Sequence, residues 1–385
     1  MHQLLSSLST PAGAPPAARA AQRRRWRMAA ALSVCAALGI YAGESLQYAP
    51  MKDVLDLPVQ PAKLNKRATA SSVAREGKRL VAVGPRGFIA LSTDGGAHWG
   101  QVGSPVQSDL VSVKFSGAGT VWAVGHDAVA LRSTDGGASW QRVLDGRTLL
   151  KLLREHYAQG AGAPDAGKVR QEVERWAAQS ATPDVLPTPF FDVSFTDANE
   201  GFLVGAFGLI LRTSDGGKHW TPWIEHAEND SRLHLYAVTG YGAQRYIAGE
   251  QGLLLKLERA SDRFVKVSTP YGGSYFGLDA SPGRLLAYGL RGNAYMSTDE
   301  GLAWQKVETG IDASLVAAVP TDPKGLLLVS QAGQVLSVSA DGRKAVPLQV
   351  PYTSEVMGAT TSESGALVLA LVDGLRVVDI LPSAP

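Results

Sequence analysis

The chain has 385 residues, of which 45% are hydrophobic and 19% charged, so it carries enough apolar material for a large folded body. Its formal net charge of +2 lacks the basic excess typical of nucleic-acid-binding proteins, and we expect no nucleic-acid partner. A single cysteine, Cys35, excludes an intrachain disulfide framework.

Residues 1–43 combine a basic leader with the uncharged apolar run Met28–Gly43. This layout is typical of a secretory signal or a signal-anchor. The run is short for a membrane span, which favours a signal peptide, whereas the long leader and Ile40 in the cleavage motif ending at Ala42 argue against simple cleavage. Both outcomes remain open. In either case we expect delivery to the periplasm or lumen, with membrane contact through residues 28–43 if they are retained.

After a linker at residues 44–53, an eight-residue pattern, Ser/Thr-x-Asp-x-Gly-x-x-Trp, occurs four times. Each copy lies between two short apolar runs, which predicts the turn of a β-hairpin shaped by Asp and Gly. We interpret these residues as structural rather than catalytic. The four copies contribute Ser92, Asp94, Gly96 and Trp99; Ser133, Asp135, Gly137 and Trp140; Thr213, Asp215, Gly217 and Trp220; and Ser297, Asp299, Gly301 and Trp304.

The position five residues before each pattern, occupied by Gly87, Ala128, Gly208 and Gly292, marks units of about 41 residues, and three further units without the full pattern follow the same spacing. We therefore predict an all-β fold, a seven-bladed β-propeller of four-stranded blades over residues 54–381, followed by a tail at 382–385. The last unit ends before its fourth strand. We expect Val54–Val59 to supply that strand and to close the ring, which removes an exposed sheet edge.

Residues 144–187 interrupt the repeat between the second and third units. Leucines at helical spacing, followed by a Gly/Ala/Pro break and a second helical pattern, predict a helical hairpin. Because strands alternate in direction within a blade, this insertion shares a face with the turns between the second and third strands. The Asp-containing turns lie on the opposite face.

The face with the insertion carries the candidate partner-binding residues. Charged tips of tight hairpins are commonly just solvated, so two interpretations stand here, an ordinary solvated surface and a protein-docking face. Trp176 is either an anchor for a partner or a residue that pins the helices to the propeller. The candidates on this face are Arg86, His126, Asp127, Glu250, Arg291, Tyr157 and Trp176.

An enzymatic alternative has to be weighed, because Asp boxes occur in sialidases. A sialidase-like site needs clustered arginines and a Tyr/Glu nucleophile pair, and the arginines here are scattered along the chain. His226 and His234 lack the spacing of a metal pair on one helix, and no phosphate-binding or calcium-binding loop is present. We expect no enzyme activity, no cofactor and no metal; a carbohydrate-active or carbohydrate-binding propeller is the alternative.

The segment Gly205–Trp220 reads Gly-x-x-Gly-x-Ile-x-x-Thr-x-Asp-Gly-Gly-x-x-Trp. In this segment the chain resembles the photosystem II stability and assembly factors, including their relatives in non-photosynthetic bacteria. The resemblance implies a non-enzymatic assembly factor, expected to be a monomer, that binds a membrane-protein complex, which in a heterotroph would be an envelope exporter or other transporter. It also implies a client-binding arginine patch, to which Arg132 and Arg212 correspond.

Overall fold

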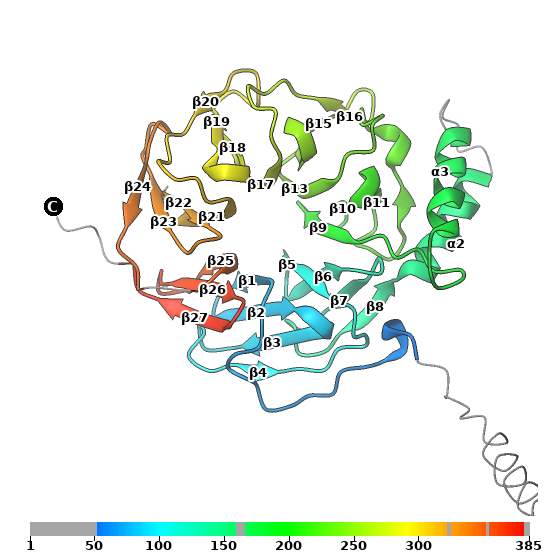
Figure 1. Ribbon diagram of the computed structural model, residues 1–385, viewed down its shortest axis with the longest axis horizontal. Helices are drawn as coiled ribbons and strands as arrows, with labels where there is room; N and C mark the ends of the chain where they lie inside the picture. The colour runs from blue at the N-terminus through cyan, green and yellow to red at the C-terminus, as the bar shows by residue number, and fades with distance from the viewer. Residues whose placement is uncertain (1–51, 159–165, 322–324, 352–353, 381–385) are drawn as a thin grey trace, which may run out of the picture. The chain divides into compact units, whose positions relative to one another are not determined.

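The computed structural model describes residues 52–158, 166–321, 325–351 and 354–380. Within Asp53–Pro385, seven antiparallel sheets are arranged in a ring around a central channel (Figure 1). Among the described residues, six sheets have four strands and the seventh has three, and the predicted seven-bladed β-propeller is confirmed.

The blades follow one another in chain order, and each begins with its innermost strand. Blade one contains β1 (Ser72–Glu76), β2 (Arg79–Gly84), β3 (Phe88–Ser92) and β4 (Gly100–Gln101); blade two contains β5 (Leu110–Gly117), β6 (Thr120–Gly125), β7 (Ala130–Ser133) and β8 (Gln141–Leu144). Blade three contains β9 (Phe190–Phe195), β10 (Gly201–Gly205), β11 (Ile210–Thr213) and β12 (Thr221–Pro222); blade four contains β13 (Leu235–Tyr241), β14 (Gln244–Gly249), β15 (Leu254–Glu258) and β16 (Arg263–Lys266). Blade five contains β17 (Tyr275–Ser281), β18 (Arg284–Gly289), β19 (Ala294–Ser297) and β20 (Gln305–Lys306); blade six contains β21 (Leu315–Thr321), β22 (Gly325–Ser330), β23 (Val335–Val338) and β24 (Ala345–Leu348); blade seven contains β25 (Val356–Thr361), β26 (Leu367–Leu371) and β27 (Gly374–Val378).

The second strand of each blade is largely apolar, because both of its faces are covered by neighbouring blades. In β10 and β26 every residue is buried, and β2 is buried after its first residue. The first strands instead line the channel, where they surround a cavity of about 540 Å³. The apolar core therefore lies between blades rather than at the centre of the ring.

The predicted closure of the ring by an N-terminal strand is wrong. Val54–Asp56 forms a 3-10 turn, η1, that is capped by the Asp53 side chain, and Val59 exchanges backbone hydrogen bonds of 2.7 and 3.0 Å with Ser104 beside blade one. Prolines at positions 58 and 61 remove backbone donors from this segment, which opposes its entry into a sheet. In the part of the chain that the structure describes, blade seven consequently has three strands, β25, β26 and β27.

Side-chain packing closes the ring instead. Leu80 and Ala90 of blade one form a buried cluster with Val368 and Ala370 of blade seven. The Ala70 N–H also donates to the carbonyl of Leu371 (3.0 Å). The seam between blades seven and one is thus mainly apolar contact, without a shared strand, and the Thr69 hydroxyl adds a hydrogen bond to the Val372 carbonyl (2.7 Å).

The insertion between β8 and β9 contains two helices, α2 (Gly146–Ala158) and α3 (Ala166–Ala178), as the leucine spacing predicts. Asp145 caps α2, because its carboxylate accepts from the N–H groups of Arg147 (3.0 Å) and Thr148 (2.8 Å). Leu149 and Leu153 are buried in a cluster with Trp220 and Ile224 of blade three. The helices are therefore packed onto the propeller.

The leader and signal segment predicted for residues 1–43, the linker up to residue 51, and the tail at 382–385 lie outside the described residues. Among the helices that the structure describes, none has the length and apolar character needed to cross a membrane.

Candidate protein-binding face

The turns between the second and third strands lie at one end of the ring, which we call the tip face. In blades one, three, four and five each turn is a 3-10 turn of three residues that ends in glycine. Its middle residue adopts φ between 54° and 57° and is exposed: Arg86, Phe207, Gln251 and Arg291. This left-handed backbone fixes a side chain at each tip so that it points away from the blade.

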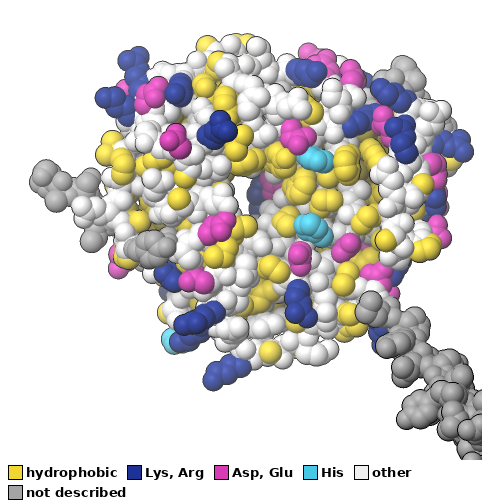
Figure 2. Space-filling view, viewed as in Figure 1, with side chains coloured by type: hydrophobic (Ala, Val, Ile, Leu, Met, Phe, Trp, Pro, Cys, Tyr) yellow, Lys and Arg dark blue, Asp and Glu magenta, His cyan; other side chains and the backbone are white. Residues whose placement is uncertain are grey.

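An aromatic row crosses the tip face from the insertion to the channel. Trp176 of α3 stacks on Phe207 of the blade-three tip, with ring centroids 5.8 Å apart, and Phe207 meets His234 at 4.9 Å. The row continues through Phe191 and Tyr236 to Phe276, which all line the channel cavity. Figure 2 shows hydrophobic side chains gathered beside the central opening, with acidic and histidine side chains among them. We define the aromatic row as Trp176, Phe207, His234, Phe191, Tyr236 and Phe276.

Hydrogen bonds hold the middle of the aromatic row in place. The Phe207 N–H donates to His234 Nδ1 (2.8 Å), and the His234 N–H donates to Glu250 Oε2 (2.8 Å). The Tyr236 hydroxyl donates to Glu250 Oε1 (3.3 Å), and burial, reinforced by that carboxylate, raises the pKa of Tyr236 to about 12. The row is therefore a preorganised surface, with Phe207 43% exposed at its centre.

The structure places the predicted candidates on the tip face in different roles. Arg86, His126 and Arg291 are exposed at the tips of blades one, two and five. Asp127 accepts from the Ser108 hydroxyl (2.7 Å), and Glu250 braces the aromatic row. The exposed charges are thus spread around the ring, and the aromatic row is the feature that is continuous.

Tyr157, predicted as a partner-binding candidate, is buried within the chain and is not available as an anchor. Its side chain is 2% exposed and its hydroxyl donates to Glu225 Oε2 (2.5 Å), while His156 Nε2 lies 3.2 Å from Glu225 Oε1. Burial together with the adjacent Glu225 carboxylate raises the pKa of Tyr157. Tyr157 therefore fastens α2 to the 3-10 turn η4 (Ile224–His226), whereas Trp176 remains half-buried against Phe207.

Arg132 and Arg212 lie at the other end of their strands, next to the Asp boxes. Each precedes the box Ser or Thr, and the Arg132 guanidinium lies over Trp122 with 5.6 Å to the ring centroid. The Arg212 side chain is 19% exposed and packs over Trp223 (4.7 Å). The structure does not bring either arginine together with Arg86 or Arg291 on the tip face.

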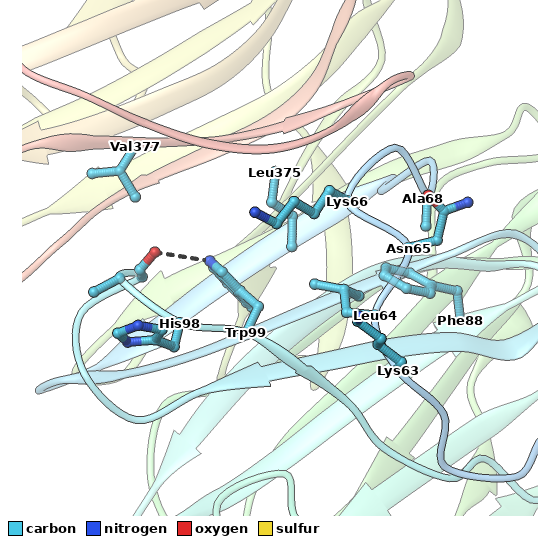
Figure 3. Close-up of a pocket in the computed structure, with 12 residues that line it drawn as sticks. Lys63, Leu64, Asn65, Lys66, Ala68, Phe88, His98, Trp99, Leu375 and Val377 are labelled. Carbon is cyan, nitrogen blue, oxygen red and sulfur yellow. Dashed lines mark hydrogen bonds between the residues drawn. The ribbon is translucent and has the colours of Figure 1, made fainter.

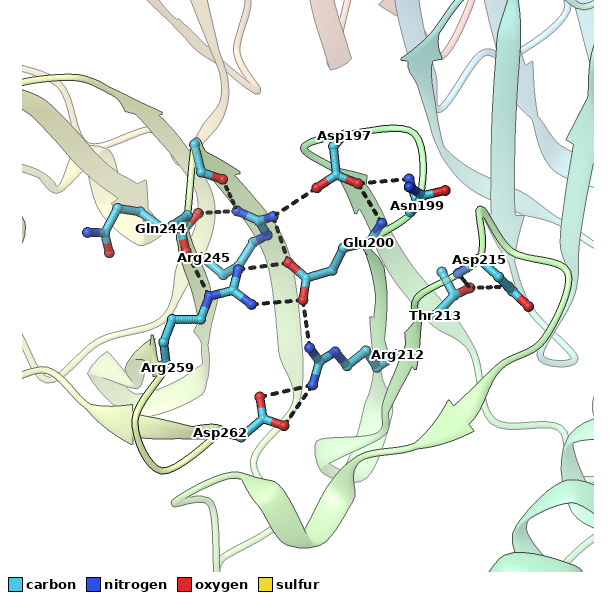
Figure 4. A network of polar contacts seen from close by, with 12 residues as sticks. Asp197, Asn199, Glu200, Arg212, Thr213, Asp215, Gln244, Arg245, Arg259 and Asp262 are labelled. Atoms are coloured by element: carbon cyan, nitrogen blue, oxygen red, sulfur yellow. Dashed lines mark hydrogen bonds and ion pairs between the residues drawn. The ribbon is translucent and has the colours of Figure 1, made fainter.

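Arg212 belongs instead to an ion-pair network between blades three and four (Figure 4). The Glu200 carboxylate accepts from Arg212 (2.8 Å), Arg245 (2.7 Å) and Arg259 (2.7 and 2.8 Å), and Asp262 binds Arg212 from the other side (2.9 Å). These contacts, the Arg259 bond foremost, lower the pKa of Glu200 to about 2. The three arginines are therefore neutralised by carboxylates of the chain, which is unsuited to gripping a substrate carboxylate.

The Asp boxes satisfy their own polar groups. In the first box, Asp94 accepts from the Ser92 hydroxyl (2.9 Å) and the His98 N–H (2.9 Å), Ser92 accepts from the Gly96 N–H (2.9 Å), and Trp99 donates to the Gly96 carbonyl (3.1 Å). The pattern repeats at the other three boxes, whose central carboxylates also have lowered pKa values. This geometry is that of a self-contained turn.

Within the described ranges, no group of three or more His, Cys, Asp or Glu side chains is arranged to hold a metal ion.

Sequence reasoning missed most of the aromatic row, because Phe191, His234, Tyr236 and Phe276 belong to three different blades. One signal was present in the sequence. Phe207 occupies a turn position that other blades fill with Arg86, Gln251 and Arg291.

Comparison with known proteins agrees with this architecture. The family model described as "Photosynthesis system II assembly factor YCF48" matches residues 169–344, from α3 to blade six. A photosystem II assembly lipoprotein Ycf48 of Synechococcus sp. (strain CC9902) is 41% identical over 64 residues, 17% of this chain and 19% of that protein. The chloroplastic photosystem II stability/assembly factor HCF136 of Oryza sativa subsp. japonica is 27% identical over 161 residues, 40% of this chain and 38% of that protein. The alignments thus cover well under two thirds of these relatives.

A solved structure described as "YCF48 bound to D1 peptide" superposes with a TM-score of 0.56 at 15% identity, covering 86% of this chain and 99% of that one. That likeness concerns the fold. The class is therefore a seven-bladed Asp-box propeller with a helical insertion beside its tip face. Within this class, residues 169–344 are similar to the photosystem II assembly factors.

Proposed function

We propose that this protein is a non-enzymatic assembly or stability factor that binds a membrane-protein complex through the aromatic row. The observation that carries the proposal is Phe207, an exposed ring held between Trp176 and His234 at the centre of a braced apolar surface. Aromatic side chains in preorganised settings supply most of the energy at protein interfaces. The similarity to Ycf48, and the solved complex of a Ycf48 protein with a D1 peptide, support a client of this kind.

The remaining aspects of function belong to the same proposal. The leader at residues 1–43 supports a periplasmic or lumenal location, with anchoring if the apolar run is retained. The client is a photosynthetic complex in a photosynthetic organism and an envelope transporter in a heterotroph of the non-photosynthetic branch. The neutralised arginines around Glu200 count against glycoside hydrolysis.

Affinity purification from membranes with mass spectrometry tests the proposal. The test variant is Phe207→Asn, because Asn tolerates the left-handed backbone at this position and removes the ring. The matched control is Leu302→Asn, which removes an apolar side chain that is 89% exposed in the fourth Asp box. We expect Phe207→Asn to recover at least about tenfold less membrane protein than the unaltered chain does.

The control variant should recover that membrane protein at the unaltered level. Equal recovery by folded Phe207→Asn would contradict binding through the aromatic row. Recovery of soluble glycan-bearing material alone, by the unaltered protein, would contradict an assembly role and favour the carbohydrate-binding alternative.

A further inference from the structure

Blade seven presents an open strand edge beside a groove. Among the described residues β27 (Gly374–Val378) pairs with β26 and with no fourth strand, whereas every other blade has one. Leu64, Phe88, Trp99, Leu375 and Val377 line a cavity of about 390 Å³ at this edge, which we call the blade-seven groove (Figure 3). The groove lies where the other blades place their outermost strand.

Comparison with blade one shows what the groove lacks. In blade one, Leu91 pairs with Gly100 of β4, and the Ile89 carbonyl accepts from the Val102 N–H (3.0 Å). Pairing with the middle strands makes Val377 the counterpart of Leu91, because they face Val368 and Val81 respectively. By this equivalence the backbone N–H and C=O groups of Val377 point outward, and its side chain is 43% exposed where Leu91 is half-buried.

Trp99 lies on the opposite wall of the groove. The box tryptophans Trp140 and Trp220 are 9% and 6% exposed, whereas Trp304, between two four-stranded blades, is half-buried. Trp99 faces blade seven and is only half-buried. An extended segment laid along β27 would cover Trp99 and Val377 together.

The charge of the groove defines what fits it. Lys63 and Lys66 stand exposed on its wall, and within the described part of the chain its lining contains no carboxylate. Alternate side chains of an added strand would point toward the apolar wall, and those between would face outward. We propose that the blade-seven groove binds an extended, acidic and apolar segment of a partner polypeptide, which adds to β27 as the fourth strand of the blade.

This interaction is separate from the aromatic row and can be tested separately. The probe is a fluorescein-labelled peptide in which valines alternate with glutamates, and binding to the full chain is followed by fluorescence anisotropy. A peptide with lysines in place of the glutamates is its charge control. We expect saturable binding of the glutamate peptide and at least about tenfold weaker binding of the lysine peptide.

Two variants address the two parts of the mechanism. Val377→Pro removes the outward N–H of the edge strand, where proline is tolerated, and should weaken the glutamate peptide at least about tenfold. The Lys63→Glu/Lys66→Glu double variant should reverse the preference toward the lysine peptide. Val377→Glu replaces Val377→Pro if circular dichroism shows that the proline variant is misfolded. Phe207→Asn should bind the peptide as the unaltered chain does.

Several results would overturn this inference. The first is the absence of saturable binding of the glutamate peptide. The second is binding of that peptide by folded Val377→Pro and Val377→Glu as tightly as by the unaltered chain. The third is an unchanged preference for the glutamate peptide in the Lys63→Glu/Lys66→Glu variant. A photocrosslinker placed at Val377 should react with the peptide. Crosslinking within the chain instead, or light scattering that shows a dimer lost in Val377→Pro, would assign the groove to the chain itself or to a second copy.

Discussion

Blade three and blade seven meet their neighbours in different ways. Blade three contacts blade two through Trp220, whose ring lies edge-on to Trp122 at 5.7 Å, and blade four through the Glu200 network. Within the described part of the chain, blade seven has three strands, and it meets blade one mainly through apolar side chains. The difference shows that one ring can combine interfaces held by aromatic contacts and ion pairs with an interface whose outer strand position is unfilled by the described residues.

Substitution of the box tryptophans should give the largest difference in unfolding free energy between these two interfaces. Trp220→Ala removes a buried ring and should cost about 3–5 kcal/mol of unfolding free energy. Trp99→Ala removes a half-buried ring that faces the blade-seven groove and should cost about half as much. Urea denaturation followed by circular dichroism measures both, and equal losses would contradict an open seam at blade seven.

Removal of ion pairs at equivalent turns of the two interfaces should give the next largest difference in unfolding free energy. Glu200→Ala leaves Arg245, whose side chain is 3% exposed, without its main partner and should cost about 3 kcal/mol. The Lys78–Glu363 pair joins the corresponding turns of blades one and seven at 3.8 Å and is 69% and 54% exposed. Glu363→Gln should therefore change the unfolding free energy by less than about 0.5 kcal/mol. A large loss there would show that the open seam also depends on charge.

The Glu200 contribution should depend on pH in a defined direction. Its pKa is lowered from 4.5 to about 2 in the folded protein, so its contribution is complete above pH 4.5 and declines as the pH falls toward 2. The difference in unfolding free energy between the unaltered chain and Glu200→Gln should be constant from neutral pH to about pH 5 and shrink below it. Urea titrations at a series of pH values test this, and a difference that grows in acid would contradict the assignment.

The smallest contrast concerns the box residue itself. Thr213 accepts from the buried Gly217 N–H (2.9 Å), and valine occupies the corresponding place in blade seven, at Val378. Thr213→Val leaves that N–H without its acceptor and should cost about 1–2 kcal/mol. Thr213→Ser keeps the hydroxyl and serves as the control, and equal losses in the two variants would assign the effect to packing instead.

Much of the fold follows from local chemistry in the sequence. The Asp, Gly and Trp of each box satisfy one another within eight residues, so the boxes reveal the blade register without knowledge of distant contacts. The closure of the ring did not follow. The apolar character of Val54–Val59 fits a strand, but Asp53 and the proline at position 58 direct it into a 3-10 turn beside blade one.

The candidate site was harder to predict than the fold, because its parts meet only after the ring has closed. Phe191, His234 and Phe276 come from three consecutive blades, and nothing in their spacing marks them as neighbours. The same holds for Glu200 and its arginines, which look scattered along the chain. Phe207 is the exception, since the repeat alone places it at a tip.

The left-handed residue at the tips of blades one, three, four and five has a consequence for how such a protein changes over time. The backbone of the turn is set by the flanking glycines and by strand pairing, and it accepts arginine, phenylalanine and glutamine with φ values within 3° of one another. A tip can therefore exchange its side chain without disturbing its blade. The ring therefore offers several positions where an exposed side chain can be substituted independently. A binding surface for a new partner can then arise by substitutions in one blade at a time.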